Sequence, residues 1–260
     1  MVTTVHGATT RLRRRPSGTM VLVSMLVVTA VTCAAGPVAS ASTAASTTPS
    51  VSPDAVGRQL ITVAATEAGS SHAVLSAWQQ REDRSWVKVL GPIPARVGAR
   101  GIGPAREGSE YTPAGTFLLD QAFGRLADPD TRLPYFATDL RDWWDENPAS
   151  PTYNLHIRRD DSPGGASENL YTTGSAYNYA VNFAYNPARI PGKGSAFFLH
   201  VGTGSATAGC VSIDQGELLT LLQWLDPAQR PTIDIRVGAA MVPSPVHSSE
   251  SSDGSVNRAV

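Results

Sequence analysis

Apolar and polar residues alternate along several short segments in the middle of the chain. In residues 177–185, tyrosine, valine and phenylalanine occupy every second position, with alanine or asparagine between them. A period of two is typical of a β-strand that buries one face. The same alternation occurs in residues 155–158 and 233–237, and the weaker strand candidates are residues 60–64, 74–78, 86–90 and 116–119. The pattern predicts a mainly β fold, either a sandwich or a small barrel.

One segment has helical periodicity instead. Asp214 is followed three residues later by Glu217, a pairing that favours a helix start. Leucines at 218, 221, 222 and 225 then recur at the spacing of one helix face, and Pro227 prevents continuation. We therefore expect a single helix that packs on the sheet.

The composition supports one β-rich domain in the central part of the chain. The 19 prolines and 23 glycines among 260 residues punctuate short apolar runs, as turns between strands do. Residues 241–260 contain mainly small or polar residues that cannot bury enough apolar surface to offset the entropy of ordering. We expect a globular domain over residues 55–240 and a disordered tail over 241–260.

The N-terminal region has the charge order of a secretory signal peptide. Four arginines between positions 11 and 15 precede an apolar run over residues 20–32, and no acidic residue occurs before Asp54. The small residues at 39–41 offer a cleavage site, so we predict a signal peptide over 1–41, a flexible linker over 42–54 and an extracytoplasmic protein. An uncleaved anchor helix and a lipid anchor at Cys33 are the alternatives.

The charge balance and the motif content exclude several function classes. The net charge is -1, which provides no one-signed field for nucleic acid or an anionic membrane. No His, Asp or Glu cluster has metal-ligand spacing, and no glycine-rich loop has the strand-to-helix context of a phosphate site. We therefore expect no nucleic-acid partner, no integral membrane domain, no metal and no cofactor.

Cys210 is the cysteine that the mature chain keeps if the leader is removed. In an exported protein a lone cysteine is a buried inert residue, an intermolecular partner or a nucleophile. Residues 195–201 read as a buried strand that ends at His200, and a loop of small residues leads from there to Cys210. If the loop folds back, His200 can remove the thiol proton and leave a thiolate that imidazolium stabilises, and the backbone amides of Gly209 and Cys210 can stabilise an oxyanion.

Two short motifs resemble those of a known family. His200-Val201-Gly202 followed by Thr207-Ala208-Gly209-Cys210-Val211, with Thr112-Pro113-Ala114-Gly115-Thr116-Phe117 upstream, is similar to the signature of the L,D-transpeptidase catalytic domain, the YkuD-like family, in a divergent actinobacterial-type branch. The resemblance implies a β-sandwich-like enzyme that cross-links peptidoglycan stem peptides through a cysteine thioester. It also implies that Cys210 is the nucleophile, that His200 is the general base oriented by a backbone carbonyl, and that Thr207 and Gly209 line the oxyanion side.

The chain departs from this family in two respects. Ser212 stands where many members have arginine, and it cannot provide a guanidinium fork for a substrate carboxylate. Arg100, Arg106 or Arg158 could replace that arginine from elsewhere in the chain. The loop from His200 to Cys210 is also shorter than is common in the family.

Other functions and residues stay open at this level. A stem-peptide carboxypeptidase or hydrolase would use the same thioester, and a non-catalytic wall-binding module would keep the fold with an inert Cys210. His156 is read as a surface or groove residue, and Trp143 and Trp144 as a pair divided between core and surface. The oligomeric state cannot be derived from the sequence.

Overall fold

The computed structural model describes residues 57–239 and residue 243. The predicted signal peptide, the linker, Cys33 and the tail over 241–260 lie outside the described residues, apart from residue 243. The description below concerns the central part of the chain.

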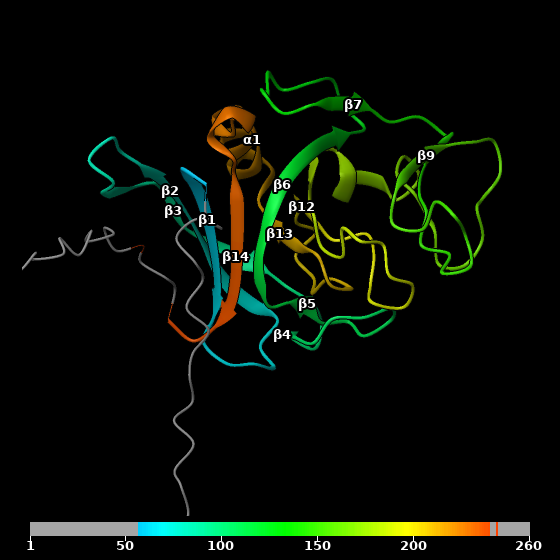
Figure 1. Cartoon of the computed structure of the whole chain (residues 1–260), viewed down its shortest axis with the longest axis horizontal. Coiled ribbons are helices and arrows are strands. Elements are labelled where there is room, and N and C mark those ends of the chain that lie inside the picture. The colour runs from blue at the N-terminus through cyan, green and yellow to red at the C-terminus, as the bar shows by residue number, and fades with distance from the viewer. Residues whose placement is uncertain (1–56, 240–242, 244–260) are drawn as a thin grey trace, which may run out of the picture. The chain divides into compact units, whose positions relative to one another are not determined.

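Eight strands close into a barrel (Figure 1). The order around the sheet is β11-β12-β13-β3-β2-β1-β14-β6, and β11 pairs with β6 to complete the ring. The strands are β1 (Gln59–Ala65), β2 (His72–Gln80), β3 (Trp86–Arg96), β6 (Gly115–Gly124), β11 (Ala180–Phe183), β12 (Phe198–Val201), β13 (Val211–Ile213) and β14 (Thr232–Val237). The barrel alternative of the predicted fold is confirmed.

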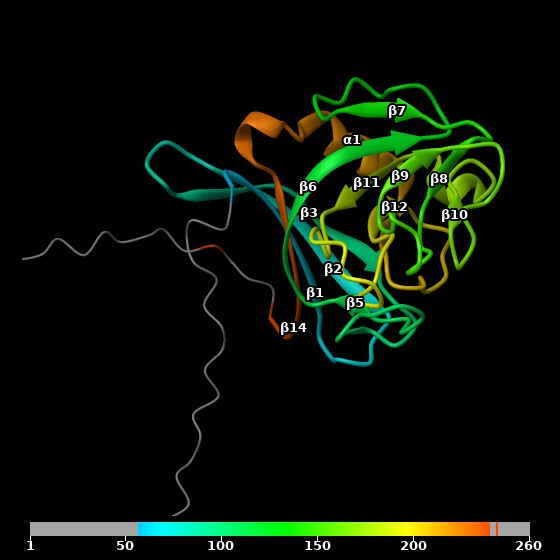
Figure 2. The ribbon, with the colours of Figure 1, turned by 45° about the vertical axis from the view of Figure 1, so that its right-hand side comes forward.

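Smaller elements extend from this barrel. β7 (Tyr135–Ala137) runs parallel to β6, and β4 (Ile102–Gly103) pairs with β5 (Thr112–Pro113). β8 (Asp142–Trp144) pairs with β9 (His156–Arg158) and β10 (Glu168–Asn169) in a separate sheet. Figure 2 shows these three strands beside β11 and β12. The described residues also form two 3-10 helices, η2 (Gly174–Tyr177) and η3 (Pro227–Gln229).

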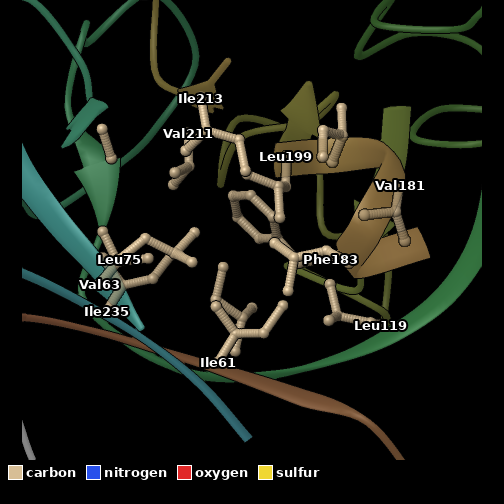
Figure 3. Close-up of a cluster of buried hydrophobic side chains, with 14 of the residues drawn as sticks. Ile61, Val63, Leu75, Leu119, Val181, Phe183, Leu199, Val211, Ile213 and Ile235 are labelled. Carbon is tan, nitrogen blue, oxygen red and sulfur yellow. The ribbon is translucent and has the colours of Figure 1, made fainter. Parts of the chain in front are cut away.

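The barrel interior holds the main hydrophobic core (Figure 3). Alternate residues of each strand point inward, because successive side chains of a strand lie on opposite faces. Ile61, Val63, Leu199, Val211 and Ile235 are at most 1% exposed. Burial of such side chains contributes about 1.5–3 kcal/mol each, which makes this core the main stabilising element of the domain.

The helix α1 (Gln215–Trp224) lies at one end of the barrel in Figure 1. Leu218, Leu221 and Leu222 are fully buried and belong to the barrel core. The Asp214 side chain accepts hydrogen bonds from the backbone N–H groups of Gly216 at 2.8 Å and Glu217 at 3.4 Å. The predicted helix and its capping residue are both confirmed.

We expect Asp214→Ala to lower the free energy of unfolding by ~1 kcal/mol, because two backbone amides at the start of α1 lose their acceptor. Asp214→Asn is the matched control, since asparagine retains a capping oxygen and should stay close to the wild type. Urea denaturation of the three proteins measures the difference. Equal losses in both variants would show that the charge, and not the cap, stabilises the helix.

The prediction of one strand over residues 177–185 is wrong. The segment consists of the end of η2 at Tyr177, a connection through Tyr179, and the short strand β11. Tyr177 is only 3% exposed but lies in the 3-10 helix η2, so its burial does not indicate a strand. A period of two reports which side chains are buried, and other backbone conformations can bury the same side chains.

Two other strands also differ from their sequence patterns. β9 begins at His156, and Leu155, predicted to lie on the apolar face, is 39% exposed. In β14 the polar position Asp234 is only 1% exposed. Thr116 donates a 2.9 Å hydrogen bond to its carboxylate and Arg236 forms an ion pair with it, so these two partners compensate the burial of the charge.

Candidate active site

The barrel places Cys210 and His200 on neighbouring parallel strands. His200 lies in β12, and Cys210 immediately precedes β13, whose residue Ser212 pairs with His200. Residues two apart on a strand share a face, so Cys210 and Ser212 face the same side of the sheet as Phe198 and His200. The loop of small residues returns the chain as the sequence predicted. The short strand β13 between Cys210 and α1 was not predicted.

The thiol of Cys210 has two hydrogen-bond partners. One is the first residue of β12, and the other lies two residues before that strand. The Sγ–H donates to the Ala196 carbonyl at 3.4 Å, and Sγ accepts from the Phe198 N–H at 3.3 Å. Within the described residues no hydrogen bond joins Cys210 to His200. The two side chains nevertheless line one cavity of about 180 Å³.

The orientation of His200 fits the role of a base. Its Nδ1 lies 2.8 Å from the Val201 carbonyl, to which it donates as Nδ1–H, so the neutral ring presents Nε2 as a free lone pair. The edge of the Tyr177 ring packs against the imidazole, with 5.5 Å between ring centroids. A backbone carbonyl therefore orients the ring, as the resemblance implied.

The environments of Cys210 and His200 do not favour the expected pair of thiolate and imidazolium. Burial raises the pKa of the Cys210 thiol well above its ordinary value, and the Glu168 carboxylate adds to the increase. Burial also lowers the pKa of His200. Both changes favour uncharged groups, so the free protein contains a neutral thiol beside a neutral imidazole. The expectation that imidazolium holds a thiolate in the free protein is thus not supported by these environments.

We expect alkylation of Cys210 in the native protein to be slow at neutral pH and to increase only above the thiol's ordinary pKa of 9.0. The sign follows from the raised pKa, because less thiolate is present at each pH than in a free cysteine. Rates with iodoacetamide between pH 5 and 10 measure it, and the same protein in urea is the control. A reactive plateau below pH 7 would instead demonstrate a thiolate–imidazolium pair.

Thr207 forms hydrogen bonds with the backbone of Gly209 and Cys210. The Thr207 hydroxyl donates to the Cys210 carbonyl at 2.6 Å and accepts from the Gly209 N–H at 3.2 Å. The Gly209 amide, expected as an oxyanion donor, is thus occupied by Thr207. Gly209 has a φ of 156°, and an added Cβ would lie 2.7 Å from the Phe197 ring. This position accepts only glycine.

Two cavities adjoin Cys210. The first, of about 180 Å³, contains His200, Thr207 and Ser212, and we call it the histidine cavity. The second, of about 230 Å³, is lined by the carboxylates Glu107, Glu110, Glu146 and Glu168 and by Arg106, and we call it the acidic cavity. Cys210, Ala208 and Glu168 line both. Cys210 thus borders both cavities, although the residue is only 9% exposed.

The three arginines that could replace the arginine absent at position 212 lie in different surroundings. Arg100 lies over the Tyr111 ring at 4.5 Å, and Arg158 forms ion pairs with Asp139 and Asp142. Arg106 alone among the three lines a cavity that contains Cys210. Ser212 faces the histidine cavity, where its hydroxyl is buried without a hydrogen-bond partner.

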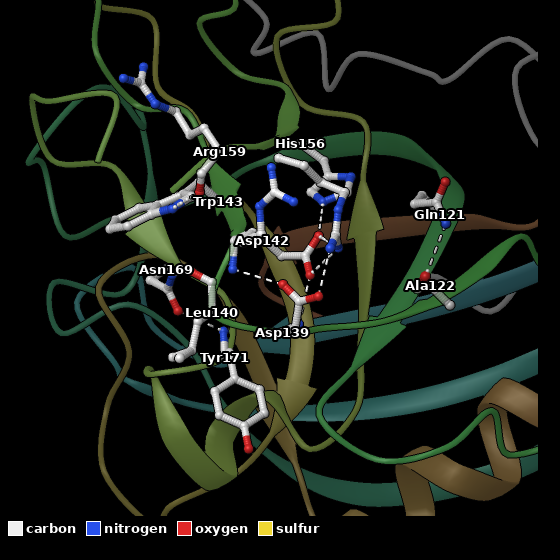
Figure 4. A network of polar contacts seen from close by, with 12 residues as sticks. Gln121, Ala122, Asp139, Leu140, Asp142, Trp143, His156, Arg159, Asn169 and Tyr171 are labelled. Carbon is white, nitrogen blue, oxygen red and sulfur yellow. Dashed lines mark hydrogen bonds and ion pairs between the residues drawn. The ribbon is translucent and has the colours of Figure 1, made fainter. Parts of the chain in front are cut away.

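The remaining conspicuous residues lie outside the two cavities. His156 bonds to the buried Asp142 at 2.8 Å (Figure 4). Its ring also stacks on Phe136. Trp144 is 6% exposed and contacts the Phe198 ring edge-on, whereas Trp143 is partly exposed and donates to the Arg159 carbonyl. The interpretation of His156 as a groove residue and of the tryptophans as a divided pair agrees with this arrangement.

Sequence reasoning missed three residues that line the cavities next to Cys210. Tyr177, Glu146 and Glu168 come from the region between β6 and β11, and no motif marks them. The Tyr177 hydroxyl donates to Glu168, and the two lie beside Cys210 and His200 along the histidine cavity. Glu146 and Glu168 are two of many acidic residues in this polar stretch, and the sequence does not show that the stretch folds against β12.

No cluster of metal-ligating side chains occurs within residues 57–239, and the same region contains no helix long and apolar enough to cross a membrane.

Comparison with known families gives one match. The model of the L,D-transpeptidase catalytic domain, YkuD, matches residues 74–241, a range that includes both motifs and the barrel strands from β3 to β14. No curated protein matches the sequence.

Proposed function

The chain belongs to the L,D-transpeptidase catalytic-domain family, and from this premise we propose that it is an exported enzyme that cross-links peptidoglycan stem peptides. The observation that carries the proposal is the pairing of β12 with β13, which brings His200 and Cys210 to one cavity. Cys210 is the nucleophile and His200 the general base in this proposal. The Cys210 backbone N–H, next to Gly209, is assigned to the developing oxyanion.

Acylation begins from neutral groups. Rotation of the Cys210 side chain breaks the weak bond to Ala196 and turns Sγ–H toward the Nε2 of His200. As Sγ attacks the carbonyl of the donor L-residue, its proton passes to Nε2, so no thiolate accumulates in the free enzyme. The tetrahedral intermediate then expels the terminal D-residue as an amine, which takes the proton back from the imidazolium. The product is a thioester on Cys210.

Deacylation repeats the proton transfers with a different nucleophile. An amine of a neighbouring stem attacks the thioester carbonyl, His200 removes the amine proton, and the thiol regains a proton as the C–S bond breaks. Water in place of the amine would make the enzyme a carboxypeptidase or hydrolase. Access to Cys210 from two cavities favours transfer, because a donor and an acceptor can approach from different sides.

A non-catalytic wall-binding module requires that Cys210 be unreachable. Two properties match that alternative, namely the low exposure of the residue and the raised pKa of its thiol. The opening of two cavities onto Cys210 and the free Nε2 of His200 match catalysis instead. Export is part of the proposal and is supported by the charge order of residues 1–41.

Intact-mass spectrometry with a tetrapeptide stem tests the proposal. We expect a covalent adduct equal to the peptide minus its terminal D-residue, and we expect an added amine to convert the adduct into a cross-linked product. Release by water alone would identify the hydrolase. The absence of any adduct with the folded protein would refute the catalytic assignment.

A further inference from the structure

Ser212 carries a buried hydroxyl group that has no hydrogen-bond partner. The residue is 1% exposed, and its Oγ atom forms no hydrogen bond. A serine hydroxyl can donate one hydrogen bond and accept two, and an unpaired hydroxyl in a buried position is destabilising. Its neighbours in β13, Val211 and Ile213, belong to the apolar core of the barrel. A serine at this position therefore requires an explanation other than the stability of the fold.

The strand register places this hydroxyl beside the imidazole. Ser212 is the Cα partner of His200 across the parallel strands β12 and β13. Adjacent strands lie about 4.8 Å apart, and paired residues project to the same face. The backbone of Ser212 pairs with β12 on one side and with Arg96 of β3 on the other, so its side chain is the part that faces the histidine cavity. Cys210 precedes it by two positions, so the thiol and the hydroxyl both lie on the β13 side of the imidazole.

The other hydroxyl groups of the histidine cavity are either bonded or exposed. The Thr207 hydroxyl donates to a backbone carbonyl, and the Tyr177 hydroxyl donates to a carboxylate. The exposed hydroxyl residues in the cavity lining are Thr173, Thr203 and Ser205. Within the described lining, Ser212 is thus the residue whose hydroxyl is buried and still able to accept a hydrogen bond.

The proposed reaction creates a donor that needs such an acceptor. His200 becomes an imidazolium whenever it removes a proton, and its Nδ1–H already donates to the Val201 carbonyl. Burial disfavours the charged ring and lowers the pKa of His200. The titratable groups that share the cavity are Glu168 from β10, Tyr177 from η2 and Cys210, and none of them is hydrogen-bonded to the ring. The new Nε2–H group therefore has no acceptor among them in the free protein.

We propose that Ser212 is a positioning residue whose Oγ accepts a hydrogen bond from the Nε2–H group of His200 once the imidazole has taken the proton from the thiol. The catalytic effect of this contact rests on the proposed function. A neutral Nε2 has no hydrogen to donate, which is consistent with the unpaired hydroxyl in the free protein. Because the bond forms only with the charged ring, it stabilises the charged intermediate more than the free enzyme. The proton then passes to the leaving amine, and Ser212 itself neither gains nor loses a proton.

Titration of His200 by NMR measures the contact without turnover. The protein carries isotope-labelled histidine, and the His200 signal is assigned by its absence from His200→Gln. We expect Ser212→Ala to lower the pKa of His200 by about one unit, because the charged ring loses an acceptor. Ser76→Ala is the matched control, since Ser76 is buried in β2 outside both cavities and should leave the titration unchanged. An unchanged pKa in Ser212→Ala would overturn the inference, and so would a raised pKa, which would mean that the hydroxyl donates to the neutral ring.

The stability of the variants separates this role from a structural one. Ser212→Ala removes a hydroxyl without a partner and leaves no other group unpaired, so its melting temperature should equal or exceed that of the wild type. A lower melting temperature would show that the hydroxyl is bonded in the free protein, which contradicts the premise. Ser212→Thr keeps the hydroxyl and should keep the wild-type titration of His200. A pKa lowered in this variant as in Ser212→Ala would also overturn the inference.

Single-turnover acylation with a tetrapeptide stem measures the consequence for the reaction. We expect Ser212→Ala to acylate about three- to tenfold more slowly at saturating donor, with an unchanged half-saturating concentration of donor. In a His200→Gln background the same change should have no further effect, because the ring that it acts through is gone. A further slowing in the double variant would show that Ser212 acts independently of His200 and would overturn the positioning role.

Failure of the proposed function has a different signature. If the wild type forms no adduct with the stem peptide but Ser212→Ala lowers the pKa of His200, the contact stands and the catalytic proposal falls. If the wild type forms the adduct and the pKa of His200 is the same in Ser212→Ala, the catalytic proposal stands and the positioning role falls.

Discussion

Replacement of Cys210 by serine is expected to eliminate the acyl adduct, and replacement of His200 by glutamine is expected to slow adduct formation by ~10²–10⁴-fold. The first effect is total, because a serine hydroxyl holds its proton more strongly than a thiol and is a far weaker nucleophile. The second is partial, because the cavity still binds the donor when the base is lost. Single-turnover acylation followed by intact mass measures both.

The neutral state of the pair makes this dependence on His200 strong. Because burial raises the pKa of the Cys210 thiol, we expect little thiolate before the substrate binds, and in the proposed mechanism the proton leaves during the attack. A glutamine at position 200 cannot accept that proton. His72→Gln is the matched control, since His72 is exposed on β2 and should leave the rate unchanged. Equal acylation rates in His200→Gln and wild type would remove His200 from the mechanism.

The pH profile distinguishes loss of the base from loss of structure. The pKa of His200 is lowered below 6.5, so the imidazole is neutral at pH 7 and gains a proton only under more acidic conditions. Acylation by wild type should therefore stay constant as the pH falls to about 6.5 and decline below that value. His200→Gln has no imidazole to protonate and should lack this decline.

The regular elements were predictable where one face alone is buried. Residues 116–119 fall within β6 and the segment after Asp214 forms α1, because their apolar periodicity matches the observed core. Residues 233–237 fall within β14, although the polar position Asp234 is buried there as well. Cys210 and His200 were predictable for a second reason: both lie within one short segment, so a local motif describes the contact between their strands. The protonation state of Cys210 and His200 was not predictable, because it depends on burial by residues from distant parts of the chain.

The excursion between β6 and β11 was the part that the sequence could not resolve. Its hydrogen bonds, such as Trp144 to Asn154 and His156 to Asp142, connect side chains of the three-residue strands β8 and β9 and of the turn between them. Such segments have no periodicity, and polar patterning alone does not tell whether a carboxylate is solvated or buried. Glu146 and Glu168 lie in this region, so the acidic cavity becomes visible only when β8 and β10 pair beside Cys210.

Phe198 connects the stability of this excursion to the reactivity of the Cys210 thiol. Its fully buried ring contacts Phe123, Trp144 and Tyr177 edge-on, within a second hydrophobic cluster that also contains Cys210. We expect Phe198→Ala to lower the free energy of unfolding by ~3–5 kcal/mol, because the lost ring leaves a cavity among rigid aromatic neighbours. Thermal and urea denaturation measure this change.

Leu199→Ala provides the matched control, because the adjacent residue points to the opposite face of β12. Leu199 lies in the barrel core, and its truncation should cost a similar ~2–5 kcal/mol. Only Phe198→Ala removes packing from the Cys210 side of the sheet, so only this variant should increase alkylation of Cys210 at temperatures where both proteins are folded. Parallel increases in the two variants would instead mean that access to Cys210 depends on global stability.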